Sequence, residues 1–336
     1  MPTEPLRNAV EHAFRFQLCR FLGLTTLLLV LAPAIWAQDS EEPVHIAVRT
    51  EMASPMRQAA SFRSDVNLVM VPVTVTDENG HPATQLTADN FSILENKQPQ
   101  QIRYFLQEDL PVSVTLILDT SQSMKPHFEE ARAAAVEFIQ ASNPQDEFRL
   151  ITFAERPHPQ TGFMPPSDAT AKTILAPLQA KGNTALWDTL YSALEGLGMA
   201  QHDRRAFLLI SDGGDNRSRY TEHEIKQALA EADVQLYAID ILKPGPLSRD
   251  DRAGLLWLDD VTDITGGQVS VVHDGGEMAH AVDQISRLLR NQYVLGYYPP
   301  ASMRDGKWHK LKVKVNSGGD QGKLHAYAKG GYYGPE

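Results

Sequence analysis

Five oxygen-bearing side chains lie in three short segments, each where an expected strand ends or an expected helix begins. Asp119, Ser121 and Ser123 follow an apolar run, Thr184 lies in a Gly-Asn-Thr-Ala-Leu segment, and Asp212 follows a second apolar run. Ligands of open α/β sheets bind at the carboxyl ends of the strands, so we expect these side chains to converge. Carboxylates and hydroxyls are hard donors that suit Mg²⁺, or else Mn²⁺ or Ca²⁺, rather than zinc or copper. The sequence therefore predicts a divalent metal site.

The charge of this donor set indicates what the metal would do. Two carboxylates roughly balance a divalent ion, while hydroxyls and water fill further positions without neutralising it. The ion then remains attractive to one more anionic oxygen. A protein ligand that presents an Asp or Glu would supply that oxygen, so the donor set predicts metal-dependent binding of a partner protein.

The elements that must position these residues alternate between strand and helix over residues 110–290. Apolar runs predict strands, and one-sided apolar spacing at intervals of three and four predicts helices. We expect strands at 112–118, 148–153, 206–211, 234–241 and 268–272, and helices at 126–140, 185–196, 221–232 and 277–291. The predicted fold class is α/β, with a doubly wound, mostly parallel sheet that has helices on both faces.

The segments on either side of this α/β domain read as β-structure. Residues 64–108 and 291–333 contain short apolar runs separated by turn residues. Each segment is near the lower limit of about 40 residues for folding alone. We therefore expect one small β-sandwich formed by both flanks, the alternative being that each packs separately onto the α/β domain.

The first 37 residues have the pattern of a secretory signal peptide. Basic Arg15 and Arg20 precede an apolar run, and small residues ending at Ala37 precede a polar segment. The alternative is an uncleaved anchor, although the apolar stretch is short for a bilayer span of about 20 residues. Residues 38–63 read as a linker. Cys19 is the single cysteine, so the mature chain would have no disulfides. We expect an exported protein, either periplasmic or secreted.

Composition and missing motifs exclude several functions. The net charge of −11 argues against a nucleic-acid partner, and membrane contact is expected only if the first segment stays uncleaved. The sequence has neither the Gly-x-Ser-x-Gly elbow of serine hydrolases nor a nucleotide-binding phosphate loop. We therefore expect no enzyme activity.

The metal-site segments resemble those of von Willebrand factor type A domains. Asp119, Ser121 and Ser123 match the family's Asp-x-Ser-x-Ser motif, and Thr184 and Asp212 match its threonine loop and its second aspartate. The resemblance implies a metal-ion-dependent adhesion site in which the serines bind the ion directly and the other groups bind it directly or through water. Segments near Val71, at 86–91 and at 293–299 also resemble exported von Willebrand-type proteins of acidobacteria.

Two other functions stay open at this point. The chain could be a structural scaffold of an envelope complex that acts through its β-sandwich. A metal-dependent hydrolase is less favoured, because no general base is evident. Asp240, on the apolar run at 236–241, could be a further ligand, but we expect a satisfied polar group at a strand end. Asp215 and Asn216 are expected to form a polar loop near the rim of the site.

Overall fold

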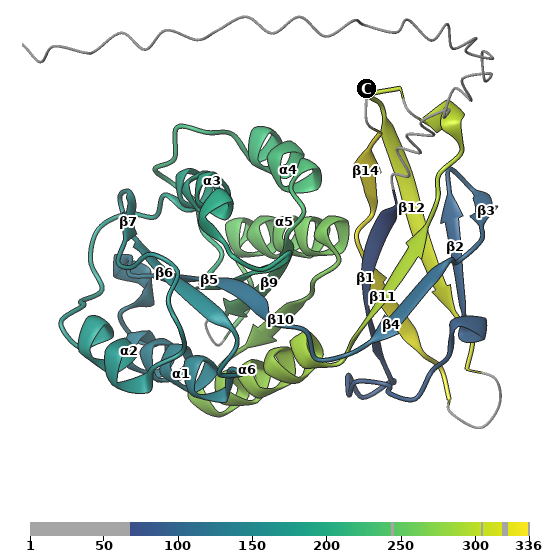
Figure 1. Cartoon of the computed structure of the whole chain (residues 1–336). Helices are drawn as coiled ribbons and strands as arrows, with labels where there is room; N and C mark the ends of the chain where they lie inside the picture. The colour runs from purple at the N-terminus through teal and green to yellow at the C-terminus, as the bar shows by residue number, and fades with distance from the viewer. Residues whose placement is uncertain (1–67, 243–244, 304, 318–321, 335–336) are drawn as a thin grey trace, which may run out of the picture. The chain divides into compact units, whose positions relative to one another are not determined.

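Two layered modules make up the described part of the chain (Figure 1). The computed structural model describes residues 68–242, 245–303, 305–317 and 322–334. The predicted signal peptide and linker, at 1–37 and 38–63, lie outside these residues. Among the described residues, no helix is both long and apolar enough to cross a membrane.

The α/β module is built on a six-stranded sheet with the spatial order β10-β9-β8-β5-β6-β7. Neighbouring strands are parallel except at the β6–β7 edge, which is antiparallel. Every residue of β5, β6 and β9 is buried, as strands covered on both faces require. The strands are β5 (Val112–Asp119), β6 (Glu147–Phe153), β7 (Pro157–Pro159), β8 (Arg204–Ser211), β9 (Gln235–Ile241) and β10 (Val269–Val272).

Three helices cover each face of this sheet (Figure 1). On one face lie α1 (Phe128–Ala141), α2 (Asp168–Leu175) and α6 (Gly275–Arg290), and on the other lie α3 (Leu186–Glu195), α4 (Glu222–Glu231) and α5 (Arg249–Thr265). Side chains alternate along β5, so that Leu118 packs in the α1 core and Ile117 packs in the α3 core. The predicted doubly wound fold class is confirmed.

The sheet has a topological switch point between β5 and β8. These strands are parallel neighbours, with Leu118 opposite Ile210. The chain leaves β5 toward α1 on one face and leaves β8 toward α4 on the other. Diverging connections open a crevice at the carboxyl ends of such strands, where ligands of this fold class bind.

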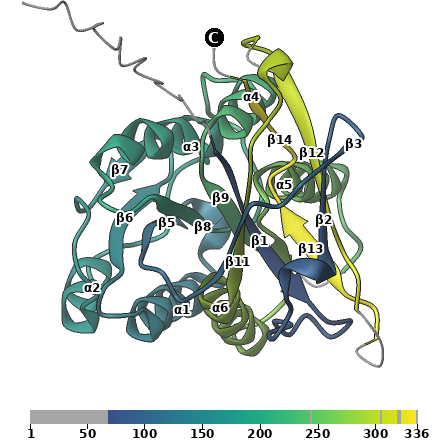
Figure 2. The ribbon, with the colours of Figure 1, turned by 45° about the vertical axis from the view of Figure 1, so that its right-hand side comes forward.

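The second module consists of two four-stranded antiparallel sheets, with the orders β13-β1-β11-β4 and β14-β12-β2-β3. The strands are β1 (Val69–Thr76), β2 (Phe91–Glu95), β3 (Gln98–Gln100), β4 (Tyr104–Gln107), β11 (Gln292–Tyr297), β12 (Trp308–Val315), β13 (His325–Ala328) and β14 (Gly331–Tyr333). Both flanks contribute to each sheet, since Val71 pairs with Leu295 and Ile93 with Val313 (Figure 2). The two sheets share one apolar core, so the predicted joint sandwich is confirmed.

A buried polar network joins the two modules. Gln292, the first residue of β11, donates through Nε2 to Gln235 Oε1 at 2.7 Å, to Thr74 Oγ1 at 3.2 Å and to the Tyr237 hydroxyl at 3.2 Å. Arg204 donates in turn to Gln292 Oε1 at 2.9 Å. Buried polar groups that bond one another in this way resist rearrangement, because separating them leaves donors unpaired.

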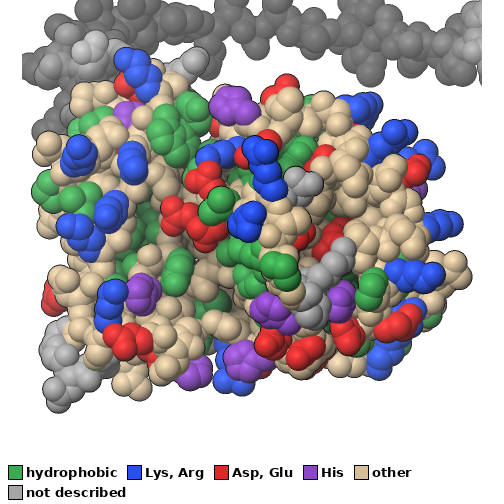
Figure 3. Space-filling model, turned by 180° about the vertical axis from the view of Figure 1, so that it is seen from behind, with side chains coloured by type: hydrophobic (Ala, Val, Ile, Leu, Met, Phe, Trp, Pro, Cys, Tyr) green, Lys and Arg blue, Asp and Glu red, His purple; other side chains and the backbone are tan. Residues whose placement is uncertain are grey.

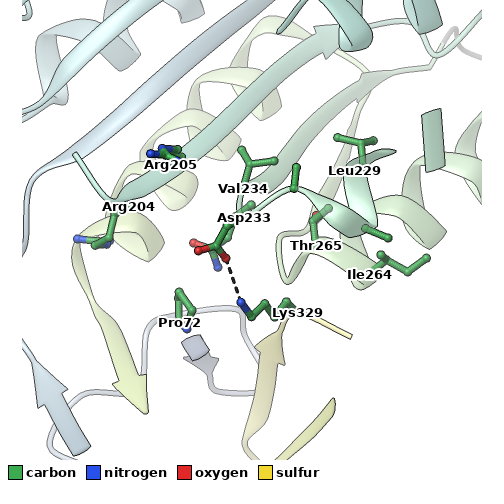
Figure 4. Close-up of a pocket in the computed structure, with 12 residues that line it drawn as sticks. Pro72, Arg204, Arg205, Leu229, Asp233, Val234, Ile264, Thr265 and Lys329 are labelled. Carbon is green, nitrogen blue, oxygen red and sulfur yellow. Dashed lines mark hydrogen bonds and ion pairs between the residues drawn. The ribbon is translucent and has the colours of Figure 1, made fainter. Parts of the chain in front are cut away.

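A small pocket lies beside this network, between the two modules (Figure 4). Pro72 of β1 faces the amino ends of β8 and β9, and Lys329 forms an ion pair with Asp233 at 3.0 Å. This junction lies at the amino end of the sheet, opposite the edge where Asp119 and Asp212 follow the ends of β5 and β8.

Helices α2 and α5 were not expected from the sequence, although α5 has 17 residues. Helix α5 begins with a capping box, in which the Ser248 and Asp251 side chains bond each other's main-chain N–H. Trp257, Leu258 and Val261 form its buried face. The Ser-x-x-Asp spacing was a readable start signal, but the acidic residues between the apolar positions obscured the helical period.

Candidate functional site

The turn after β5 brings two serine hydroxyls together. Asp119 is the last residue of β5, and its Oδ1 accepts a hydrogen bond of 2.7 Å from the main-chain N–H of Ser121. This Asx-type turn redirects the chain, and a short 3-10 helix at Gln122–Met124 follows. Ser121 Oγ and Ser123 Oγ lie 3.0 Å apart. The two serine hydroxyls of the motif therefore face each other.

Asp119 is completely buried, and both of its carboxylate oxygens accept hydrogen bonds. Its Oδ2 accepts a 2.7 Å bond from the hydroxyl of Ser211, the last residue of β8. Burial is the main cause that raises the pKa of Asp119 to about 7; the negative charge of Asp212 acts in the same direction, and the bonds from Ser211 and Ser121 oppose it. A bound cation would favour the ionised form, so metal binding and proton release are coupled here.

The threonine loop is bonded directly to the turn after β5. The N–H of Lys181 donates to the Thr120 carbonyl at 2.8 Å, and the N–H of Gln122 donates to the Gly182 carbonyl at 2.9 Å. Gly182 has a φ of +86°, a left-handed conformation that suits glycine. These bonds place the buried Thr184, just before α3, beside the serine turn.

The loop after β8 completes the arrangement. Asn216 and Thr184 bond each other reciprocally at 3.0 Å: the N–H of Asn216 donates to the Thr184 carbonyl, and the N–H of Thr184 donates to Asn216 Oδ1. Asp215 Oδ2 accepts a 3.1 Å bond from the N–H of Trp187 in α3. Asp212 lies partly exposed directly after Ser211. Hydrogen bonds thus connect all three loops that carry the predicted ligands.

Three residues of this edge were not assigned from the sequence. Ser211 orients Asp119, and Asn216 anchors Thr184, which is a more specific role than the polar rim that we expected. The third is Asp240, which we expected to be satisfied. Both of its carboxylate oxygens are buried and have no hydrogen-bond partner in the described part of the chain. A strand-end Ser or Asp after an apolar run is a signal for Ser211 and Asp240, and the position of Asn216 in the loop after β8 carries no such signal.

The donors at this edge fit a hard cation. Within the described ranges, no group of three or more His, Cys, Asp or Glu side chains is placed to hold a metal ion. Hydroxyls and two carboxylates suit Mg²⁺, Mn²⁺ or Ca²⁺. The paired hydroxyls of Ser121 and Ser123 and the fixed carboxylate of Asp119 fit that chemistry. Assignment of all five residues as ligands stays a prediction.

Solved structures with a similar fold come from several sources. BatB from Bacteroides thetaiotaomicron is 20% identical, with a TM-score of 0.43 over 53% of this chain and 98% of that one. A von Willebrand factor type A protein from Catenulispora acidiphila is 14% identical, with a TM-score of 0.47 over 75% and 76%. Proximal thread matrix protein 1 from the mussel byssus, with a zinc-occupied MIDAS motif, is 17% identical, with a TM-score of 0.46 over 58% and 49%. At these sequence identities and TM-scores, none of these similarities supports a function for this chain.

One family model matches a segment of the chain. No curated protein matches the chain. The family model for the von Willebrand factor type A domain matches residues 114–214, which run from β5 through the loop after β8. This segment includes all five predicted ligands and four of the six strands of the sheet. The likeness to acidobacterial proteins has no support from these comparisons. Residues 114–214, in the α/β module of this chain, therefore match the model of the von Willebrand factor type A domain.

Proposed function

We propose that this chain is an exported protein-binding module that uses a divalent cation to hold an acidic residue of a partner protein. The cation would be held by Asp119, Ser121, Ser123, Thr184 and Asp212. Domains of this family are often metal-dependent interaction modules, which supports the proposal at the level of the family. Export is supported by the signal-type sequence of residues 1–37.

One observation carries the proposal: two serine hydroxyls lie 3.0 Å apart at the switch point, beside a buried carboxylate that is held in place. Hydroxyls bind a cation without cancelling its charge. A bound Mg²⁺ or Mn²⁺ would supply a Lewis-acidic position that attracts one more oxygen anion. A carboxylate of a partner protein is the simplest such anion.

The residues around the ion would have different tasks. Ser121 and Ser123 present free lone pairs and would bind the cation through their hydroxyl oxygens. Asp119 already accepts bonds on both oxygens, so it would contribute negative charge and hold the serine turn in shape. Asn216 would keep Thr184 against the same point through the reciprocal bonds described above.

The surface charges are consistent with a protein partner. On the face seen in Figure 3, Lys and Arg side chains are interspersed with Asp and Glu side chains and do not form one continuous basic stripe. A nucleic-acid partner would favour a concentrated basic surface. The net charge of −11 points in the same direction.

A scaffold that acts through the β-sandwich is a second candidate function, because that module exposes aromatic side chains. Tyr104, Tyr298 and Tyr333 are 39%, 50% and 43% exposed. Aromatic residues are enriched in protein interfaces, because they bury a large area with few rotatable bonds. This reading predicts partner binding that needs no metal.

Paired measurements on Ser123→Ala and on a control separate the two functions. Titration of the metal-free chain with Mn²⁺ is expected to show an affinity that falls about tenfold or more in Ser123→Ala, because a cation loses one oxygen ligand. Ser270→Ala, at a partly exposed serine of β10, is expected to bind Mn²⁺ as wild type does.

The same proteins then serve as baits for envelope extracts, with Mg²⁺ or with a chelator. Partners that are lost both with chelator and in Ser123→Ala support metal-dependent binding. Partners that stay bound under every condition favour the scaffold. A wild-type chain that binds no Mn²⁺ overturns the proposed function.

A further inference from the structure

Asp240 occupies an unusual position at the carboxyl edge of the six-stranded sheet, where the predicted metal ligands lie. It is the next-to-last residue of β9, directly opposite Ser211 of β8 in the strand register. Ser211 in turn bonds Asp119 at the end of β5. Ala238 lies two residues before Asp240, and Leu209 lies two residues before Ser211. Both pack in the core beneath α3, α4 and α5. Because side chains alternate along a strand, Asp240 and Ser211 point to that same face. Three adjacent strand ends thus carry carboxylate, hydroxyl and carboxylate in a row.

The main chain of the loop after β8 packs against the side chain of Asp240. Gly213 has a φ of +76°, and a Cβ at that position would lie 2.9 Å from Asp240 Oδ1. Helix α5 packs behind the loop, since a Cβ on Gly254 would lie 2.7 Å from the Gly213 carbonyl oxygen. Asp240 is therefore only 1% exposed, and its carboxylate lies next to the loop that begins with Asp212.

Nothing in the described part of the chain satisfies this carboxylate. Neither oxygen has a hydrogen-bond partner. Burial raises the pKa of Asp240 to about 7, and the negative charges of Asp212 and Asp251 act in the same direction. A buried carboxylate is ordinarily paired, bonded or bound to a metal, because an isolated one is costly to desolvate. The carboxylates that act on it have its own charge, so a cation would satisfy it where they do not.

We propose that Asp240, together with Asp212, holds a second divalent cation beside the one at the serine turn. This inference rests on the proposed function, because Asp212 would serve both ions. The chemical class of the second ion follows from the donors: carboxylate oxygens, with water at the remaining positions, suit Mn²⁺, Mg²⁺ or Ca²⁺.

The charge balance shows why a second ion matters for partner binding. Asp119, Asp212 and Asp240 together carry three negative charges when all are ionised. One divalent cation leaves a net charge of about −1 on this centre when all three carboxylates are ionised, which weakens the attraction that the cation exerts on an acidic partner. Two divalent cations leave it positive, which favours one incoming carboxylate. The second ion would therefore strengthen binding of an acidic partner.

Counting bound Mn²⁺ tests the proposal on the full chain. Electron paramagnetic resonance measures free Mn²⁺, and the difference from total Mn²⁺ gives the number of ions bound per chain. At saturation we expect two bound ions in wild type and one in Asp240→Asn. Asp263→Asn, at an exposed aspartate of helix α5, is the control and is expected to keep two. The number of ions bound by wild type is itself a test, because it does not depend on whether any variant folds. Asp240→Ser provides the same comparison if the Asn variant does not fold.

The outcomes separate this inference from the proposed function. One bound ion in wild type, unchanged in Asp240→Asn, overturns the second site and leaves the adhesion-type site standing. Two ions that both persist in Asp240→Asn also overturn it, because Asp240 is then no ligand. A wild-type chain without bound Mn²⁺ overturns the proposed function and this inference with it.

Discussion

Replacing Ser211 with alanine removes the hydroxyl that holds Asp119. Ser211 is fully buried; its Oγ donates to Asp119 Oδ2 at 2.7 Å and accepts from the N–H of Gly213 at 3.2 Å. In Ser211→Ala, one oxygen of a buried carboxylate loses its donor. The bond from Ser211 lowers the pKa of Asp119, so its loss raises that pKa above its present value of about 7.

The size of the effect follows from the loss of a hydrogen bond to a charged group. Such a bond contributes about 1.5–3 kcal/mol. Expressed as affinity, this is roughly a 10- to 100-fold weaker binding of Mn²⁺. The cation needs ionised Asp119, so the loss should be largest near pH 6, where the variant holds a proton there, and smaller near pH 9. Calorimetric titration with Mn²⁺ at both pH values measures it.

Ser113 provides a matched control at the opposite end of the same sheet. It is also buried, its hydroxyl donates to the Glu147 carboxylate at 2.6 Å, and it accepts an N–H bond from His202 at 3.2 Å. Ser113→Ala should lower stability to a similar extent and leave the Mn²⁺ affinity unchanged at every pH. If both variants weaken metal binding equally, or if neither does, the role assigned to Ser211 is wrong.

Three further outcomes are expected. Mn²⁺ at 100 times its dissociation constant should stabilise the chain by about 2.7 kcal/mol, and a melting temperature that does not rise would contradict a folded-state metal site. In chelator, the folded state holds a proton on Asp240 up to about pH 7 and the unfolded state only to about 3.8, so wild type loses stability as pH rises through this window. The melting temperature of Asp240→Asn relative to wild type should therefore increase from pH 4 to pH 8, and a constant difference would argue against a buried unpaired carboxylate. Gln292→Ala should lower stability by about 1–3 kcal/mol in chemical denaturation, because Gln235 and Tyr237 lose a buried partner. Asp233→Asn, at the exposed carboxylate of an ion pair with Lys329, should cost about 1 kcal/mol or less.

The sequence alone was sufficient wherever the determining interactions are local. Apolar runs at β5 and β8 predicted buried parallel strands, and the fold class followed from their alternation with helices. The alternate spacing of Ser121 and Ser123 after the strand end placed their hydroxyls on one side of the turn, because a strand end and the turn after it are short-range geometry. The small size of each flank predicted the shared sandwich, because neither segment could bury a sufficient core alone.

Tertiary structure alone decided which distant groups meet. Three features depend on the register between strands and on how α5 packs against the loop after β8. They are the bond from Ser211 to Asp119, the reciprocal bonds of Asn216 with Thr184, and the burial of Asp240. Strand register and helix packing are set by the whole core at once. A single buried carboxylate therefore reads, in sequence, like any polar residue at a strand end, and only its surroundings reveal that it lacks a partner.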